Sequence, residues 1–234
     1  MAVTPNLTGS DGKPLTWVGA TPHSTGQPGT PTNITVAMAA TNYPEDQGLP
    51  PPFTHSLPQE FVPLLQAAED TWELYANIKF INVPDAPSIG QSADIRVGMA
   101  SLWEPTTRTI GTTLRNYNPI NDKFLPDKLV RIEDPTGLPV TRLPNGDYRY
   151  NGSEATVFQD LLHELGHALG LAHNLNDPTS IMSSLAGSNN PLPDAQDIAG
   201  IQAIYGAPKP HSVALTSSEV TTLKGLGILP TSFA

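Results

Sequence analysis

The amino-acid sequence predicts an α+β fold, because segments with helical spacing of apolar residues occur among short β-rich segments. Helices are expected at 57–77, 153–170 and 194–206. Strands are expected at 33–44, 78–83, 93–101, 109–117 and 128–134. The 234 residues are enough for one sizeable domain with a real hydrophobic core and additional segments at its ends.

The first segment, 1–31, is rich in Thr, Pro and Gly and shows little periodicity, which predicts an irregular arm. Two interpretations of this arm stay open. The favoured one is a solvated linker, and the other is an arm that crosses a cleft and inhibits it. Asp11 and His23 are candidate metal contacts within it.

Local signals place the ends of the other elements. Pro58 suits the first turn of the helix 57–77, whose Glu69 and Asp70 are expected on its solvated face. The segment 45–53 is a loop interrupted by prolines, and the turn sequence Pro-Asn-Gly-Asp predicts a hairpin within 134–152.

Residues suited to N-capping occur at the start of each of the later helices. Ser153 is the expected N-cap of the helix 153–170, and Asp194 that of the helix 194–206. In the tail, Ser217 or Ser218 would cap a further short helix.

The most specific stretch is 158–174, FQDLLHELGHALGLAHN. His163 and His167 are four residues apart, so on a helix they lie on one face, one turn apart. That spacing allows two imidazoles to bind one Zn²⁺. Glu164 points to a neighbouring flank of the helix, where it can act as a general base on water without binding the metal.

A third histidine completes the pattern. Gly170 can adopt a positive φ angle, so the helix can end there and the chain can turn. The turn would bring His173 to the metal as a third ligand. Three protein ligands leave one position open, which is typical of a catalytic zinc site.

The motif HELGHALGLAH resembles the zinc signature of the metzincin endopeptidases. Residues 180–183, Ser-Ile-Met-Ser, resemble the methionine turn of that clan, with Met182 as an apolar floor beneath the metal. The segment 194–206 resembles the closing helix shared by matrixins and serralysins, whose family is peptidase family M10.

This resemblance implies a zincin-like, twisted five-stranded mixed sheet with an active-site helix, a second long helix and a C-terminal closing helix. It also implies that 109–117 is the sheet edge above the cleft, where an extended substrate pairs. The expected organisation is an arm (1–31), a catalytic domain (32–208) and a C-terminal tail (209–234).

The resemblance further implies a secreted zinc endopeptidase that acts on protein or peptide substrates, with His163, His167 and His173 as zinc ligands and Glu164 as the general base. Two alternatives stay open: a zinc-containing binding or adhesion module without turnover, and a latent form blocked by the arm or the tail. Calcium is a second candidate cofactor, for which the sequence assigns no residues.

Composition limits the other function classes. The formal net charge of −10, from 12 basic and 22 acidic residues, argues against nucleic acid or an anionic membrane as a partner. No apolar run is long enough for a membrane span, and no export signal is visible at the N-terminus. The chain has no cysteine, so zinc must depend on His and carboxylate ligands. The oligomeric state is left open.

Overall fold

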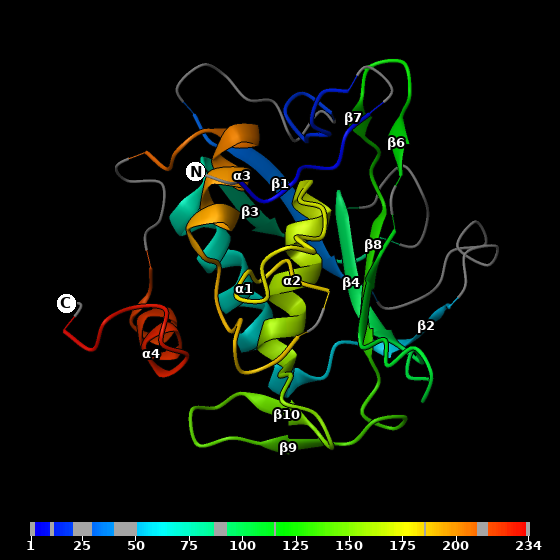
Figure 1. The fold of residues 1–234 in the computed structure, drawn as a ribbon, viewed down its shortest axis with the longest axis vertical. Helices are drawn as coiled ribbons and strands as arrows, with labels where there is room; N and C mark the ends of the chain where they lie inside the picture. Colours follow the sequence, from blue (N-terminus) through cyan, green and yellow to red (C-terminus); the bar gives the residue numbers. More distant parts are fainter. Residues whose placement is uncertain are drawn as a thin grey trace.

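The computed structural model describes residues 3–9, 12–20, 30–39, 51–86, 93–114, 116–184, 186–209 and 215–232. Their main sheet has the order β3-β1-β4-β8-β5, with β2 paired to β4. Its strands are β1 (Thr32–Met38), β2 (Phe53–Ser56), β3 (Ile78–Asn82), β4 (Ile95–Ala100), β5 (Gly111–Thr113) and β8 (Lys128–Glu133). Helices α1 (Val62–Tyr75) and α2 (Val157–Leu169) lie together on one face of this sheet (Figure 1). The predicted α+β class is confirmed.

The sheet is mixed, as expected. Strands β1, β3, β4 and β8 pair in parallel, and β5 pairs antiparallel to β8 at the edge. The path therefore holds the five predicted strands. The antiparallel strand β2 is an addition that the sequence did not indicate, and it begins at Phe53, the last residue of the predicted loop 45–53. It forms because Phe53 is buried against Ala39 and Leu129.

The expected strand 109–117 is interrupted. Only Gly111–Thr113 pairs with β8, and the amide of Leu114 makes one more bond to the carbonyl of Leu129 at 2.9 Å. The chain then leaves the sheet. Tyr117–Asn118 (β6) instead pairs with Lys123–Phe124 (β7) in a separate small hairpin.

The N-terminal arm is not a solvated linker in residues 3–9 and 12–20, so the favoured interpretation was wrong there. Leu7, Leu15 and Trp17 are buried in the main core. The indole Nε1 of Trp17 donates to the carbonyl of Ala168 at 3.0 Å, and the amide of Leu7 donates to the carbonyl of Gly170 at 2.7 Å. The sequence did not predict this burial, because the arm packs without regular secondary structure and its apolar residues therefore show no periodicity. Asp11 and His23 lie outside the described residues.

The predicted hairpin within 134–152 is confirmed as β9 (Val140–Arg142) and β10 (Tyr148–Tyr150), which lie at the N-terminal end of α2 (Figure 1). This hairpin moves the start of α2. The chain turns through 151–154, and the amide of Tyr150 donates to the carbonyl of Ala155, so Ser153 lies in this turn and not at the start of the helix. The N-cap of α2 is therefore Thr156, whose side chain accepts from the amide of Gln159, and the expectation for Ser153 was wrong.

The two C-terminal helices differ in how well their caps were predicted. Helix α3 (Ala195–Tyr205) begins with Asp194 in a capping box, as expected. Helix α4 (Ser217–Gly225) is capped by Thr216 in place of Ser217 or Ser218. It packs on α1, with Leu223 fully buried. Across the described residues, no helix is both long and apolar enough to cross a bilayer.

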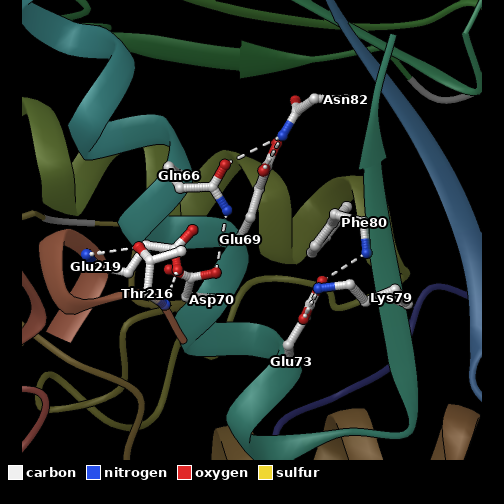
Figure 2. Close-up of polar contacts among 9 residues, drawn as sticks. All are labelled: Gln66, Glu69, Asp70, Glu73, Lys79, Phe80, Asn82, Thr216 and Glu219. Atoms are coloured by element: carbon white, nitrogen blue, oxygen red, sulfur yellow. Dashed lines mark hydrogen bonds and ion pairs between the residues drawn. The ribbon is translucent and has the colours of Figure 1, made fainter. Parts of the chain in front are cut away.

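Helix α1 buries three acidic residues on the faces that β3 and α4 cover, so the expectation that Glu69 and Asp70 are solvated was wrong. Glu69 is 0% exposed and Asp70 is 3% exposed. The amide of Asn82 donates to Glu69 at 2.9 Å, and Glu73 pairs with Lys79 at 2.8 Å (Figure 2). Burial raises the pKa of Glu69 from 4.5 to about 8, although the bond from Asn82 opposes this rise.

We predict that Glu69→Gln stabilises the protein increasingly as pH rises from 4.5 to 8. The unfolded carboxyl loses its proton near 4.5 and the folded one near 8, so the wild-type chain loses stability across that interval. The free energy of unfolding of the variant should exceed that of the wild type by on the order of 2–4 kcal/mol at pH 8, with little difference at pH 4.5. Urea unfolding at both pH values measures it. Exposed Glu60→Gln is the control, and a pH-independent difference for Glu69→Gln would contradict the assignment.

Candidate metal centre

Two of the three predicted histidines lie on α2, and a carbonyl group holds one ring nitrogen of each. The Nδ1 atom of His163 lies 2.7 Å from the carbonyl oxygen of Ile181, and that of His167 lies 2.8 Å from the carbonyl oxygen of Leu171. A carbonyl only accepts, so each Nδ1 carries the hydrogen. The Nε2 atom of each ring therefore keeps the lone pair that a metal requires.

Gly170 ends α2 as expected, with φ of 109°. Its own amide bonds back to the last turn, and the amide of Leu171 donates to the carbonyl of Gly166 at 2.9 Å. A residue with a side chain is unfavourable at this position for two reasons. The positive φ angle disfavours a Cβ atom, and that atom would lie 2.7 Å from the carbonyl oxygen of Leu15. The arm thus closes on the turn that reverses the chain.

The reversal brings His173 to the other two histidines. Its ring centroid lies 5.3 Å from that of His163 and 4.6 Å from that of His167. The ring centroids of His163 and His167 are 4.6 Å apart. One ligand atom of each residue lies within 4.8 Å of the others. His173 is exposed, so the cluster has an open side.

This donor set fits zinc. Three neutral imidazoles are ligands that Zn²⁺ binds readily, and three protein ligands leave a fourth position for water or substrate. Burial lowers the pKa of His163 to about 4, so its neutral, metal-binding form prevails at physiological pH.

Glu164 lies beside the cluster and beneath the edge strand β5. The hydroxyl of Thr113 donates to its Oε2 atom at 2.6 Å, which fixes one carboxylate oxygen. The residue is 4% exposed, and burial raises its pKa to about 8. Gly111 leaves room for it, because a Cβ atom there would lie 2.6 Å from its Oε1 atom.

A second buried carboxylate, Asp160, lies next to Glu164. It precedes Glu164 by one helical turn, and its Oδ1 atom would lie 2.2 Å from a Cβ atom on Gly111. The hydroxyl of Tyr150 on the β9–β10 hairpin donates to its Oδ2 atom at 2.9 Å. Burial, and then the charge of Glu164, raises the pKa of Asp160 well above its ordinary value.

The segment around Met182 lies under α2 and is organised by Asp197. Met182 is fully buried, and a Cβ atom on Gly166 would lie 2.5 Å from its sulfur. Asp197, on α3, accepts from the hydroxyl of Ser180 at 2.6 Å and from the amide of Ile181 at 2.8 Å. It thereby places the Ile181 carbonyl that orients His163.

The structure therefore brings together the sequence-predicted residues His163, His167 and His173, with Glu164 and Met182 beside them. Sequence reasoning missed Gly111, Thr113, Asp160 and Asp197. Asp197 carried a usable signal, because it stands three residues after the predicted N-cap Asp194, as in a capping box.

Comparisons with known proteins agree with this geometry. The matrixin family model matches residues 54–206. The chain is 43% identical to neutrophil collagenase from Homo sapiens over 85 residues, covering 30% of this chain and 18% of the collagenase. It is 46% identical to macrophage metalloelastase from Oryctolagus cuniculus over 65 residues, covering 26% and 13%. It is 45% identical to matrix metalloproteinase-16 from Rattus norvegicus over 67 residues, covering 27% and 10%. The chain thus spans less than a fifth of the length of these relatives.

We predict that Gly111→Ala lowers peptidase activity by at least about tenfold while the protein retains its metal. The added methyl group would displace the carboxylates of Asp160 and of Glu164, the predicted general base, and a small displacement of a general base is costly. Turnover and zinc content of the variant measure the effect. Gly187→Ala is the matched control, because no atom lies within 4 Å of its added Cβ. Full activity in Gly111→Ala would show that the position of Glu164 does not depend on this glycine.

Proposed function

The chain belongs to the matrixin family of zinc metalloendopeptidases, and we propose that it hydrolyses internal peptide bonds of protein substrates. The observation that carries this proposal is the position of Glu164, buried beside three converging imidazoles on an open face. A site that only holds a metal for stability has no use for a buried carboxylate at that place.

We propose that His163, His167 and His173 hold the zinc. Bound there, zinc would supply Lewis-acid polarisation of the scissile carbonyl and lower the pKa of a water molecule. The carbonyls of Ile181 and Leu171 orient two of the rings before the metal arrives, which reduces the cost of binding.

Glu164 is the proposed general base, since a zinc ion on the neighbouring histidines would oppose the effect of burial and lower the pKa of its carboxyl group. The hydroxyl of Thr113 occupies its Oε2 atom, so its Oε1 atom is the one that takes a proton from the attacking water and returns it to the leaving amine. Gly111 has no side chain, so no Cβ atom occupies the space next to the Oε1 atom. Met182 fills the volume beneath α2 as an apolar side chain and holds no proton or metal.

Strand β5 is the proposed docking edge for the substrate. In the described part of the chain it pairs only with β8, so its other edge presents unpaired backbone groups next to α2. An extended peptide can pair with such an edge, which would place a scissile bond over the histidines. This geometry supports unfolded or locally extended protein segments as substrates.

The organisation into an arm (1–31), a catalytic domain (32–208) and a tail (209–234) remains part of the proposal. Because Leu7, Leu15 and Trp17 are core residues, we propose that the arm completes the catalytic domain. We also propose that the protein acts outside the cell, since secretion is typical of the matrixin family.

We predict that Glu164→Gln lowers turnover of a fluorescently labelled unfolded protein by about 10²–10⁴-fold, because that is the usual contribution of general acid–base catalysis. Zinc content and melting temperature should stay close to those of the parent. Glu154→Gln, an exposed acid just before α2, is the matched control and should retain full turnover. Equal turnover of Glu164→Gln and the parent would remove Glu164 from the mechanism.

A further inference from the structure

A hollow of about 270 Å³ lies between α1 and α4, away from the histidine cluster. Its walls combine apolar side chains of α1, among them Val62, Pro63 and Ala67, with polar ones. The polar side chains include Asp70 of α1 and, from α4 and its N-cap, Thr216, Ser218, Glu219 and Thr222. None of the described residues that line it is Lys, Arg or His. Two carboxylates therefore share one hollow without a basic partner in its walls.

Asp70 carries the strongest indication of a missing ligand. It is 3% exposed, and its Oδ1 atom accepts from the side-chain amide of Gln66 at 3.0 Å. Its Oδ2 atom is buried and accepts no hydrogen bond. A buried carboxylate oxygen without a donor is costly, and native proteins rarely leave one so. Figure 2 shows this side chain directed toward Thr216 and Glu219 on α4.

The neighbouring acids of α1 do not share this site. Glu69 and Glu73 extend toward β3, where Asn82 donates to Glu69 and Lys79 pairs with Glu73 at 2.8 Å (Figure 2). Lys79, the basic residue whose charge reaches Asp70, is thus paired on the far side of α1 from α4. Asp70 is left to face α4.

Glu219 adds a second negative charge across the hollow. Its carboxylate already accepts from the amide of Thr216 in the capping box that begins α4. Burial raises the pKa of Asp70 to about 6, and the charge of Glu219 adds to that rise. At physiological pH the two helices therefore meet with like charges facing each other, unless a cation lies between them.

We propose that a Ca²⁺ ion binds in this hollow, with Asp70 and Glu219 as its carboxylate ligands, and fastens α4 to α1. Calcium takes six to eight oxygen ligands in flexible geometry, and the hollow has room for water beside the hydroxyl groups of Thr216, Ser218 and Thr222. The walls offer no His or Cys, so a softer metal such as zinc is not favoured. The bound ion would supply the partner that the Oδ2 atom of Asp70 lacks.

This site is independent of the proposed peptidase chemistry. Helix α4 lies outside the region 54–206 that the family model matches, and it reaches the core through Leu223. Calcium would therefore control how firmly the C-terminal segment is docked on the catalytic domain, without contacting the histidines.

The test uses the full-length, zinc-loaded chain in buffers freed of calcium on a chelating resin, at pH 7.5. Calorimetric titration with Ca²⁺ gives the number of sites and their affinity, and hydrogen exchange of the amides in 215–229 reports on docking of α4. We compare the parent with Asp70→Asn and Glu219→Gln, which keep the hydrogen bonds to Gln66 and Thr216 but remove one charge each. Exposed Glu60→Gln is the control for net charge.

The parent should bind one more equivalent of Ca²⁺ than either variant, or bind it at least about tenfold more tightly, and Ca²⁺ should slow exchange in α4 only in the parent and in Glu60→Gln. Without Ca²⁺, Asp70→Asn should be as stable as the parent or more stable, so misfolding cannot explain a lost site. Three results would overturn the proposal: equal Ca²⁺ binding by all four proteins, hydrogen-exchange rates in α4 of the parent that do not change with Ca²⁺, or equal protection of these amides by Mg²⁺.

Discussion

Three imidazoles can share one metal ion only if the chain reverses at once where the helix ends, and the rest of this structure depends on that constraint. Two of the rings follow from helical spacing, but His173 reaches them only through the left-handed turn at Gly170. The N-terminal arm packs against this turn. The carbonyl oxygen of Leu15 lies against Gly170, and the carbonyl of Pro5 accepts a hydrogen bond from the amide of Ala172. A segment at the start of the chain thus supports the geometry of a site more than 150 residues away.

A second set of contacts holds the histidines in the correct ring orientation. Asp197 accepts from Ser180, from the amide of Ile181 and from Thr4, so one buried carboxylate connects α3, the methionine turn and the arm. Because the Ile181 carbonyl orients His163, the position of a proposed metal ligand depends on a residue at the start of α3. Charge-assisted bonds to a buried carboxylate are strong and short, which suits this role.

The sequence predicted the elements and the histidine cluster whose information is local. The spacing of His163, His167 and Gly170 specifies a helix, a metal pair and a turn without further context. The sequence did not predict the burial, the caps and the contacts that depend on tertiary packing. Trp17 is in the core although its segment has no periodicity, and Asp70 is buried because α4 covers it. Thr156 caps α2 in place of Ser153, since Ser153 lies in a turn whose Ala155 carbonyl bonds to Tyr150 of the hairpin. Gly111 and Thr113 gain their importance only from the register of β5 over Glu164.

The central claim is that His163, His167 and His173 bind one zinc ion and leave one position open. X-ray absorption spectroscopy at the zinc edge, on protein purified without added metal, tests it most directly. The account predicts one zinc per chain with three imidazole nitrogens at about 2.0–2.1 Å and one further oxygen ligand. A first shell with fewer than three imidazoles, or a chain that holds no zinc after purification, would contradict it.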